Sequence, residues 1–199
     1  MGGGCRPVVT GRRVNRKFFD VRHIHTMVMS LHQLDDSDRA GVAALSGYGI
    51  LDTPNEPEFD AIVREAAETF GTPIALISLL DENRQWFKAK IGLEPSETPR
   101  SISFCTYAIR GQGVFSVPDT TADDRFSSNP LVTGDPGIRS YAGAPLRTPD
   151  GLSFGTLCVI GTQPGRVLTL EEQAKLESLA GKVMEAMERR RRLRVSNAH

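Results

Sequence analysis

Two pairs of strand-like segments, each joined by a very short connection, constrain the fold of this chain more than any other feature. Residues 73–80 (PIALISLL) are almost entirely apolar, and only DENR separates them from residues 85–92 (QWFKAKIG). Residues 139–148 and 152–162 are separated only by Pro-Asp-Gly, a strong turn signal. Parallel strands need a crossover of a dozen or more residues, so both pairs are expected to be antiparallel.

Alternation within these segments predicts which side chains share a face of the sheet. A further strand is expected at residues 113–119 (GVFSVPD). For residues 85–92, the alternation predicts one face with Phe87, Ala89 and Ile91 and the other with Trp86, Lys88 and Lys90.

Helical periodicity appears before, between and after the strands. The last helix, over residues 169–195, opens with a capping box of Thr169 and Glu172. Three other helices are expected. The first begins near Ser37, the second is capped by Asn55 and ends at Gly71, and the third runs from about Ser103 to Arg110. Strands that follow one another, with helices grouped apart from them, indicate an α+β fold with a central antiparallel sheet.

Charge divides the chain into three parts. Residues 1–34 carry six Lys or Arg against one acid and little periodicity, so we expect a disordered basic tail, or a natural start at Met27 or Met29. Residues 35–188 form the expected domain, with 13 basic against 23 acidic residues, which argues against a nucleic-acid surface. Residues 189–199 are the Arg-rich end of the last helix and a tail.

Compartment follows from what the sequence lacks. Its longest nearly apolar run, residues 74–80, is far too short to span a bilayer, and the N-terminus lacks a convincing signal peptide. With three cysteines and no secretory signal, a cytoplasmic protein with reduced thiols and no membrane partner is expected.

Histidine is absent from the expected domain, since all four lie in the tails at positions 23, 25, 32 and 199. This argues against Cys-His and Ser-His nucleophile pairs and against the usual zinc and haem ligation. No P-loop, dinucleotide-binding glycine pattern or CxxC is present either. We therefore predict no catalytic residue and no metal site.

Cys105 and Cys158 can be interpreted either as reactive thiols or as residues that line a core or a pocket. Cys105 would lie in the first turn of a helix capped by Ser103, where backbone N–H groups favour a thiolate. However, Cys105 shares a helical face with Ala108 and Ile109, and free cysteine is usually buried. Core or pocket lining is favoured over reactive thiols.

An acidic and Arg-containing stretch spans residues 119–139. Turn formation and ion pairing are favoured there over direct ligand contact, and EF-hand spacing is absent. The charged residues are Asp119, Asp123, Asp124, Arg125, Asp135 and Arg139.

The last helix also carries a heptad-like seam. It can form a dimerising coiled coil or pack on its own domain, and the sequence leaves both open. The seam consists of Leu176, Leu179, Val183, Ala186, Arg190 and Leu193.

Several segments in order resemble the GAF domain family, in the type found beside bacterial histidine kinases and diguanylate cyclases. They include YGILDTPNEPEFDAIVREAAETFG, SISFCTYAI, DDRFSSNPLVTGDPGIRSYAGAPL and GTLCVIG, within residues 39–192. The resemblance implies long terminal helices packed on one face of the sheet, often dimerising, and a small-molecule pocket on the other. Carried over by position, the pocket candidates are Phe104, Cys105, Asp119, Asp124, Arg125, Phe126, Asn129, Arg139, Tyr141 and Cys158.

Departures from the family pattern narrow the range of ligands that the resemblance supports. Tyr107, Ser140 and Gly161 replace a frequent histidine, aromatic and aspartate, and Thr106 follows Cys105 where bilin-binding relatives commonly have histidine. The cyclic-nucleotide signature is absent, so bilin, haem and cyclic nucleotide are not supported as cofactors.

The resemblance implies a sensory module rather than an enzyme. It would bind a small molecule or a protein partner and signal in trans, for example to a kinase or cyclase, through the terminal helices of a homodimer. One alternative is a thiol oxidoreductase, similar to free methionine sulfoxide reductases, that uses Cys105 and Cys158. Another is a degenerate domain for dimerisation only, which a pocket filled by side chains would favour.

Overall fold

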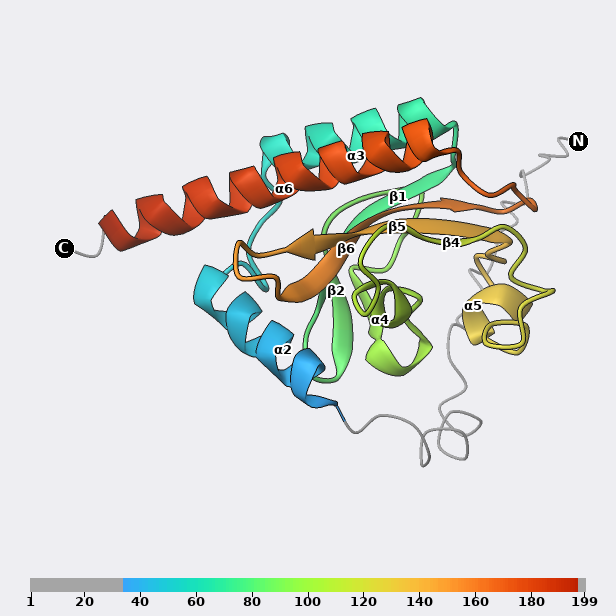
Figure 1. The fold of residues 1–199 in the computed structure, drawn as a ribbon, viewed down its shortest axis with the longest axis horizontal. Helices are drawn as coiled ribbons and strands as arrows, with labels where there is room; N and C mark the ends of the chain where they lie inside the picture. Colours follow the sequence, from blue (N-terminus) through green and yellow to red (C-terminus); the bar gives the residue numbers. More distant parts are fainter. Residues whose placement is uncertain (1–33, 197–199) are drawn as a thin grey trace, which may run out of the picture. The chain divides into compact units, whose positions relative to one another are not determined.

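The computed structural model describes residues 34–196, which form one six-stranded sheet with helices on both faces (Figure 1). The strand order is β3-β2-β1-β6-β5-β4, and every neighbouring pair is antiparallel. The strands are β1 (Ile74–Leu80), β2 (Arg84–Ile91), β3 (Glu97–Pro99), β4 (Phe115–Val117), β5 (Ser140–Arg147) and β6 (Ser153–Gly161). Both predicted hairpins are confirmed.

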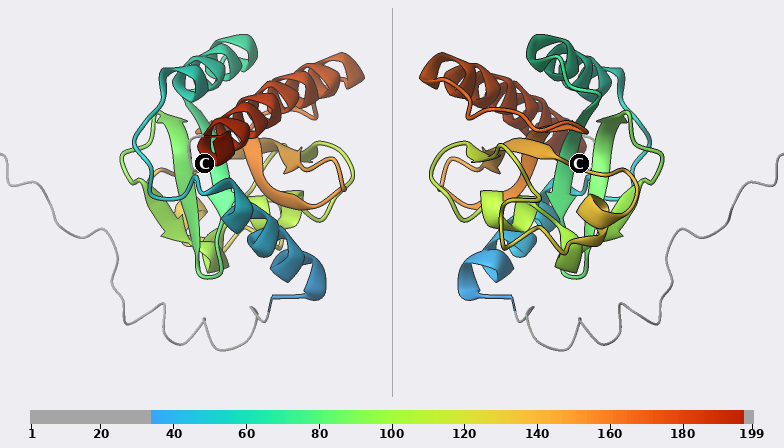
Figure 2. Two further views of the ribbon diagram at one scale, coloured as in Figure 1. Left: turned by 90° about the vertical axis from the view of Figure 1, so that its left-hand side faces the viewer. Right: turned by 90° about the vertical axis from the view of Figure 1, so that its right-hand side faces the viewer.

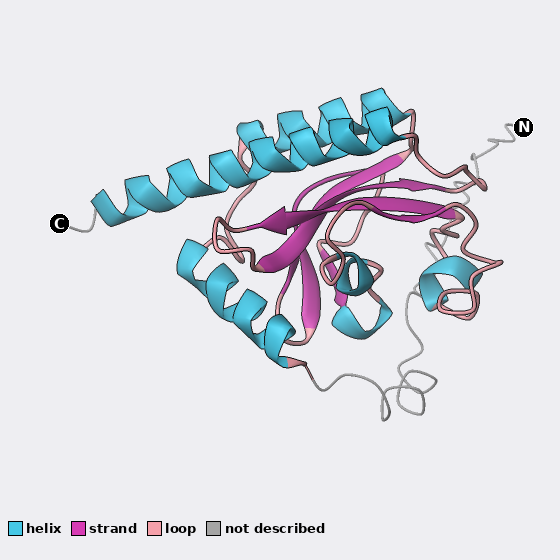
Figure 3. Ribbon diagram, in the orientation of Figure 1, coloured by secondary structure: helices cyan, strands magenta, loops and turns pink. Residues whose placement is uncertain are grey.

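Two long helices cover one face of this sheet, α3 (Pro57–Phe70) and α6 (Leu170–Ser196) (Figures 1 and 2). The short helices α4 (Cys105–Ala108) and α5 (Pro130–Thr133) lie on the other face. Helix α2 (Asp36–Tyr48) packs against β6 and α6, at the end of the sheet (Figure 3). The α+β fold with an antiparallel sheet and long helices on one face is therefore confirmed.

Alternation along the central strands separates two apolar cores. On β6, Leu157 and Val159 belong to the core beneath α3 and α6, whereas Cys158 and Ile160 belong to the core beneath α4 and α5. Strand β1 is buried along its whole length because both of its faces are covered.

A bulge in β2 overturns the predicted faces of that strand. Ile77 of β1 pairs with Ala89, but the next residue pairs with Phe87, which leaves Lys88 as the extra residue. The alternation reverses there, so Trp86 shares the α3 side with Ala89 while Phe87 faces the α4 side. The expected grouping of Phe87 with Ala89 was wrong.

Two helix starts differ from the sequence prediction. Helix α2 begins at Asp36, near Ser37 as predicted, with the side chain of Asp35 as its cap. Helix α3 begins at Pro57 rather than after Asn55, and its N-cap residue makes no side-chain capping bond. Helix α4 begins only at Cys105, because the hydroxyl of Ser103 donates to Gln85 instead of capping the helix.

Helix α6 confirms the predicted capping box. The Thr169 N–H donates to the Glu172 carboxylate at 2.8 Å, and the Glu172 N–H donates to the Thr169 hydroxyl at 3.2 Å. This reciprocal pair satisfies two of the N–H groups that a helix start leaves free.

The predicted heptad seam packs largely within its own chain. Four seam residues on the inner side of α6 are at most 1% exposed: Leu176, Leu179, Val183 and Ala186. Leu193, near the end of the helix, is 65% exposed. Packing on the domain therefore accounts for the first four positions, and dimerisation through the seam stays a prediction.

Residues 1–33 and 197–199 lie outside the described residues, and with them nearly all of the predicted basic tail. No helix among residues 34–196 is both long and apolar enough to cross a membrane.

Candidate functional site

A small cavity of about 20 Å³ lies between the sheet and the cover formed by α4, α5 and their connections. Four of the predicted pocket residues line it: Phe104, Cys105, Tyr141 and Cys158. The sequence prediction missed the other lining residues, which are Ile74, Leu76, Gln85, Phe87, Leu93, Thr98, Leu131, Pro136, Ile138 and Ile160.

A polar wall on one side of the cavity was missed because of the β2 bulge. The Gln85 side-chain amide donates to the Thr98 hydroxyl at 3.2 Å, and Gln85 in turn accepts from Ser103. All three side chains are buried. The reversal at Lys88 directs Gln85 to the α4 side, and no local sequence signal marks that bulge.

Stacked aromatic rings close the cavity on the cover side. The rings of Phe104 and Phe126 are stacked with centroids 4.2 Å apart, and the Phe104 and Tyr141 rings are 5.3 Å apart. Phe126 is buried but does not itself line the cavity. It therefore holds the long segment before α5 onto the sheet.

Arg125 lies outside this stack, at the surface of the cover. Its guanidinium carbon is 5.0–5.8 Å from the ring centroids of Phe115, Phe126 and Tyr107, within cation–π range. It also pairs with Asp123 at 2.5 Å, so the hydrogen bonds to this carboxylate lower the pKa of Asp123. Arg125 thus fastens the cover rather than facing the cavity.

The remaining predicted pocket residues do not line the cavity. Asn129 caps α5 by accepting from the Leu131 N–H at 2.9 Å, and its amide donates to the Ile102 carbonyl at 3.0 Å. Asp119 and Arg139 are partly exposed and lie 3.5 Å apart, and Asp124 is exposed. Ion pairing and turn formation, the favoured interpretation of this stretch, account for Asp119 and Arg139.

The two thiols meet at the base of the cavity. Both cysteines are free and buried. The Cys105 sulfur accepts from the Thr156 hydroxyl at 3.0 Å and from the Tyr141 hydroxyl at 3.3 Å.

These surroundings separate the acidities of the two thiols. Burial opposes ionisation of Cys105, but its polar surroundings, which include the Thr156 and Tyr141 hydroxyls that donate to the sulfur, bring its pKa below the ordinary thiol value. The nearby Cys105, together with burial, raises the pKa of Cys158 well above that value. Cys105 is therefore the more acidic of the two thiols.

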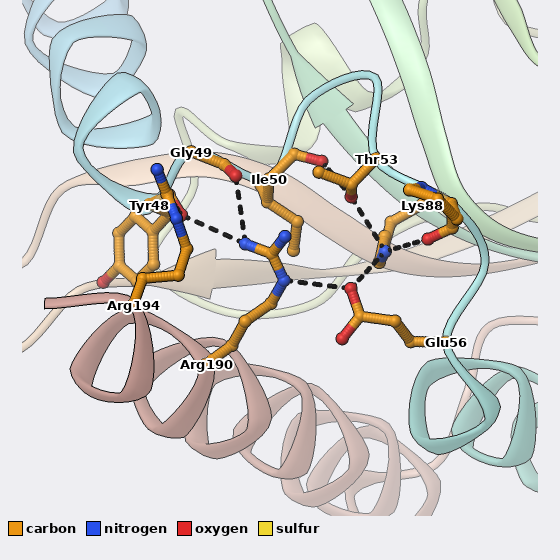
Figure 4. A network of polar contacts seen from close by, with 9 residues as sticks. Tyr48, Gly49, Ile50, Thr53, Glu56, Lys88, Arg190 and Arg194 are labelled. Atoms are coloured by element: carbon orange, nitrogen blue, oxygen red, sulfur yellow. Dashed lines mark hydrogen bonds and ion pairs between the residues drawn. The ribbon is translucent and has the colours of Figure 1, made fainter. Parts of the chain in front are cut away.

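On the opposite face, a polar network joins the sheet to α6 (Figure 4). The buried Lys88 ammonium lies 2.7 Å from the Glu56 carboxylate and also donates to the Thr53 hydroxyl and the Pro54 carbonyl. The same Glu56 oxygen accepts from Arg190 of α6 at 2.9 Å. The bulged residue of β2 and the last turns of α6 thus share one carboxylate.

Arg190 and Arg194 extend this network to α2. Arg190 donates to the Gly49 carbonyl at 3.0 Å, and Arg194 donates to the Tyr48 carbonyl at 2.7 Å (Figure 4). Cations close to a helix C-terminus are favourable, since its last carbonyls lack partners. Arg190, an apparent interruption of the heptad seam, is thus an intramolecular contact.

No group of three or more His, Cys, Asp or Glu side chains among residues 34–196 is arranged to hold a metal ion.

Comparison with known proteins agrees with the fold. The family model described as GAF domain matches residues 55–187. A cyclic di-GMP phosphodiesterase of Pseudomonas aeruginosa is 48% identical over 149 residues, which are 75% of this chain and 25% of that protein. This chain therefore spans about a quarter of the length of that relative.

Two solved structures illustrate the shared architecture. The GAF domain of an Acinetobacter phosphoenolpyruvate-protein phosphotransferase has a TM-score of 0.57 at 18% identity, over 78% of this chain and 95% of that chain. A free methionine-R-sulfoxide reductase from Neisseria meningitidis has a TM-score of 0.55 at 18% identity, over 82% and 98%. At these identities the likeness concerns the fold alone. The sheet order, the helix layers and the family match over residues 55–187 together show that this chain belongs to the GAF domain family.

Proposed function

We propose that this chain is a sensory module that binds a small molecule beneath α4 and α5 and passes its state through the sheet to α6. The observation that carries the proposal is the alternation of β5 and β6. Tyr141 and Cys158 face the cavity, whereas their neighbours Ala142 and Val159 belong to the core under α6. A shift of either strand would therefore alter both faces.

The cavity wall suits a mainly apolar ligand. Its surface is almost wholly apolar, and the polar groups of Gln85, Thr98 and Tyr141 beside it make their hydrogen bonds within the protein. At about 20 Å³ the closed cavity holds roughly one water molecule. A larger ligand requires the cover to move, and Phe126 would have to leave its place against Phe104.

The small closed volume also agrees with the alternative of a dimerisation-only domain. The unfilled space that remains beneath the cover favours ligand binding over that alternative, for which a pocket filled by side chains is expected.

For output, we propose regulation of an enzyme of cyclic di-GMP or phosphotransfer signalling. The similarity to part of a cyclic di-GMP phosphodiesterase supports the first of these. A homodimer through the end of α6 and an output partner such as a kinase or cyclase belong to the same proposal. The exposed Leu193 provides an apolar contact for either.

Native mass spectrometry of the purified protein tests the ligand directly. We expect a bound molecule that is retained by Leu170→Phe and lost in Leu131→Phe. The first is a matched control, since Leu170 is 84% exposed, whereas Leu131 lines the cavity. A molecule retained equally by both variants would contradict the assignment to this cavity.

A thiol oxidoreductase is the second candidate, favoured by one observation, the presence of both free cysteines on one cavity. Steady reduction of free methionine sulfoxide with dithiothreitol, lost in Cys105→Ser, would establish it. Absence of turnover in the folded wild type would reject it.

A further inference from the structure

Cys105 and Cys158 form a pair that neither ligand binding nor signalling requires. They come from the cover helix α4 and the central strand β6, which pack against each other, and both line the same cavity. The Cys105 sulfur accepts a 3.0 Å hydrogen bond from Thr156, which lies two residues before Cys158 on β6, so the two cysteines lie close to each other in the fold.

The surroundings of this pair differ from those of inert buried thiols. Cys105 accepts hydrogen bonds from Tyr141 and Thr156, both of which are buried. Donors aimed at sulfur stabilise a thiolate, which is the nucleophilic form of cysteine. The cavity of about 20 Å³ beside them exceeds the minimum space for one water molecule, roughly 10–15 Å³. Hydrogen peroxide has two oxygen atoms, so some opening of the cover is needed for it to reach the nucleophile.

We propose that Cys105 and Cys158 are a peroxide-reactive dithiol that closes an intramolecular disulfide between α4 and β6. Cys105 attacks one oxygen of hydrogen peroxide, the O–O bond breaks, and the departing hydroxide takes the Cys105 proton to become water. Cys158 then attacks the sulfur of the Cys105 sulfenic acid, and the sulfenic oxygen leaves as a second water with the Cys158 proton. Two thiols thus lose two electrons and two protons to one peroxide.

The disulfide would change the cover as well as the cysteines. It ties α4 covalently to β6, and it removes the thiolate acceptor of the Tyr141 and Thr156 hydroxyls. Oxidation would thereby alter the cavity wall without any ligand, so this inference goes beyond the proposed function and does not depend on it.

The test uses the full chain with Cys5→Ser, which leaves only the two cysteines in question. Hydrogen peroxide is added at pH 7, samples are quenched by alkylation, and intact mass reports the loss of two hydrogen atoms. We expect the folded protein to form the disulfide at least about threefold faster than the same chain in urea, because the larger thiolate fraction of a more acidic thiol is partly offset by its lower nucleophilicity. Oxidation that is no faster in the folded chain than in urea overturns the proposal.

Two further variants in this background assign the roles. In Cys158→Ser, dimedone should trap a sulfenic acid at Cys105, and in Cys105→Ser the remaining thiol should react at least about tenfold more slowly. Equal trapping at Cys158 in Cys105→Ser would contradict the assigned nucleophile. If that variant fails to fold, peptide mapping of dimedone in the chain with both cysteines decides the same point: label at Cys105 supports the assignment, and label at Cys158 contradicts it.

Discussion

Replacing Glu56 by alanine tests the network that joins β2, α6 and α2. The change leaves the Lys88 ammonium, whose side chain is 0% exposed, with the Thr53 hydroxyl and the Pro54 carbonyl as hydrogen-bond partners and the Phe59 ring at 5.2 Å, but without a carboxylate. Arg190 loses its carboxylate too, but it is partly exposed and keeps its bond to the Gly49 carbonyl. The main cost is therefore that of a buried, unpaired lysine.

The magnitude follows from the burial of each partner. Removing one partner of a fully buried pair costs about 3–5 kcal/mol. The Glu56 side chain is 38% exposed, so solvent screens part of the interaction, and we expect about 2–3 kcal/mol. Lys88→Met removes the buried charge at similar length, and Glu56 keeps Arg190, so its cost should stay within about 1 kcal/mol.

Urea unfolding followed by Trp86 fluorescence at pH 7 measures these costs. Glu58→Ala is the matched control, because Glu58 pairs only with the exposed Arg189 among the contacts described, and its cost should be within about 0.5 kcal/mol. The double variant Glu56→Ala with Lys88→Met should be more stable than Glu56→Ala alone. A double variant that is less stable than Glu56→Ala would refute the reasoning.

The same contacts predict a dependence on pH. Burial alone would raise the pKa of Glu56, but the hydrogen bonds from Lys88 and Arg190 bring it below its ordinary value of 4.5. A lowered folded-state pKa gives stability that is present above pH 4.5 and lost as pH falls through the folded-state value. Wild type and Glu56→Ala should therefore converge in stability towards acid.

Three further predictions concern other contacts. Burial and a 2.5 Å hydrogen bond to Glu188 raise the pKa of Tyr48 to about 12, so wild type should lose up to about 2–3 kcal/mol between pH 10 and 12 relative to Tyr48→Phe. Parallel stability curves for the two proteins over this range would contradict that shift. Gly155→Ala places a Cβ 2.3 Å from the Ser78 carbonyl oxygen in the sheet, and a loss of at least about 2 kcal/mol in urea unfolding is expected; a loss below 0.5 kcal/mol would mean that β1 and β6 separate easily. Thr169→Ala removes the α6 cap and should cost about 1 kcal/mol, whereas an unchanged unfolding midpoint would show that the cap adds nothing.

Local patterns predicted most of the fold because their causes lie within a few residues. The short connections dictated antiparallel hairpins, and the capping box at Thr169 depends on a residue three positions away. Contacts between distant parts of the chain were not predictable in this way. Glu56 is the N-cap residue of α3, but its carboxylate binds Arg190, 134 residues later, instead of capping the helix.

The site shows the same division. Phe104, Tyr141 and the two cysteines were found through the family resemblance, whereas Gln85 and Phe87 were missed because a bulge at Lys88 reversed the expected faces. The family resemblance also assigned four charged residues to the pocket by their position in the chain: Asp119, Asp124, Arg125 and Arg139. Their side chains are instead partly or fully exposed on the cover, because burying a charged group is costly unless it is paired.

Trp86 offers the most direct test of the central claim, that the cavity communicates with the helix layer across the sheet. It is the only tryptophan and belongs to the core under α3 and α6, while its neighbours Gln85 and Phe87 line the cavity. A panel of metabolites is screened for a raised melting temperature and, in parallel, for a change in Trp86 emission. The account predicts at least one compound that does both in wild type and Leu170→Phe but neither in Leu131→Phe. A panel without any stabilising compound, or a compound that stabilises all three proteins equally, would contradict it.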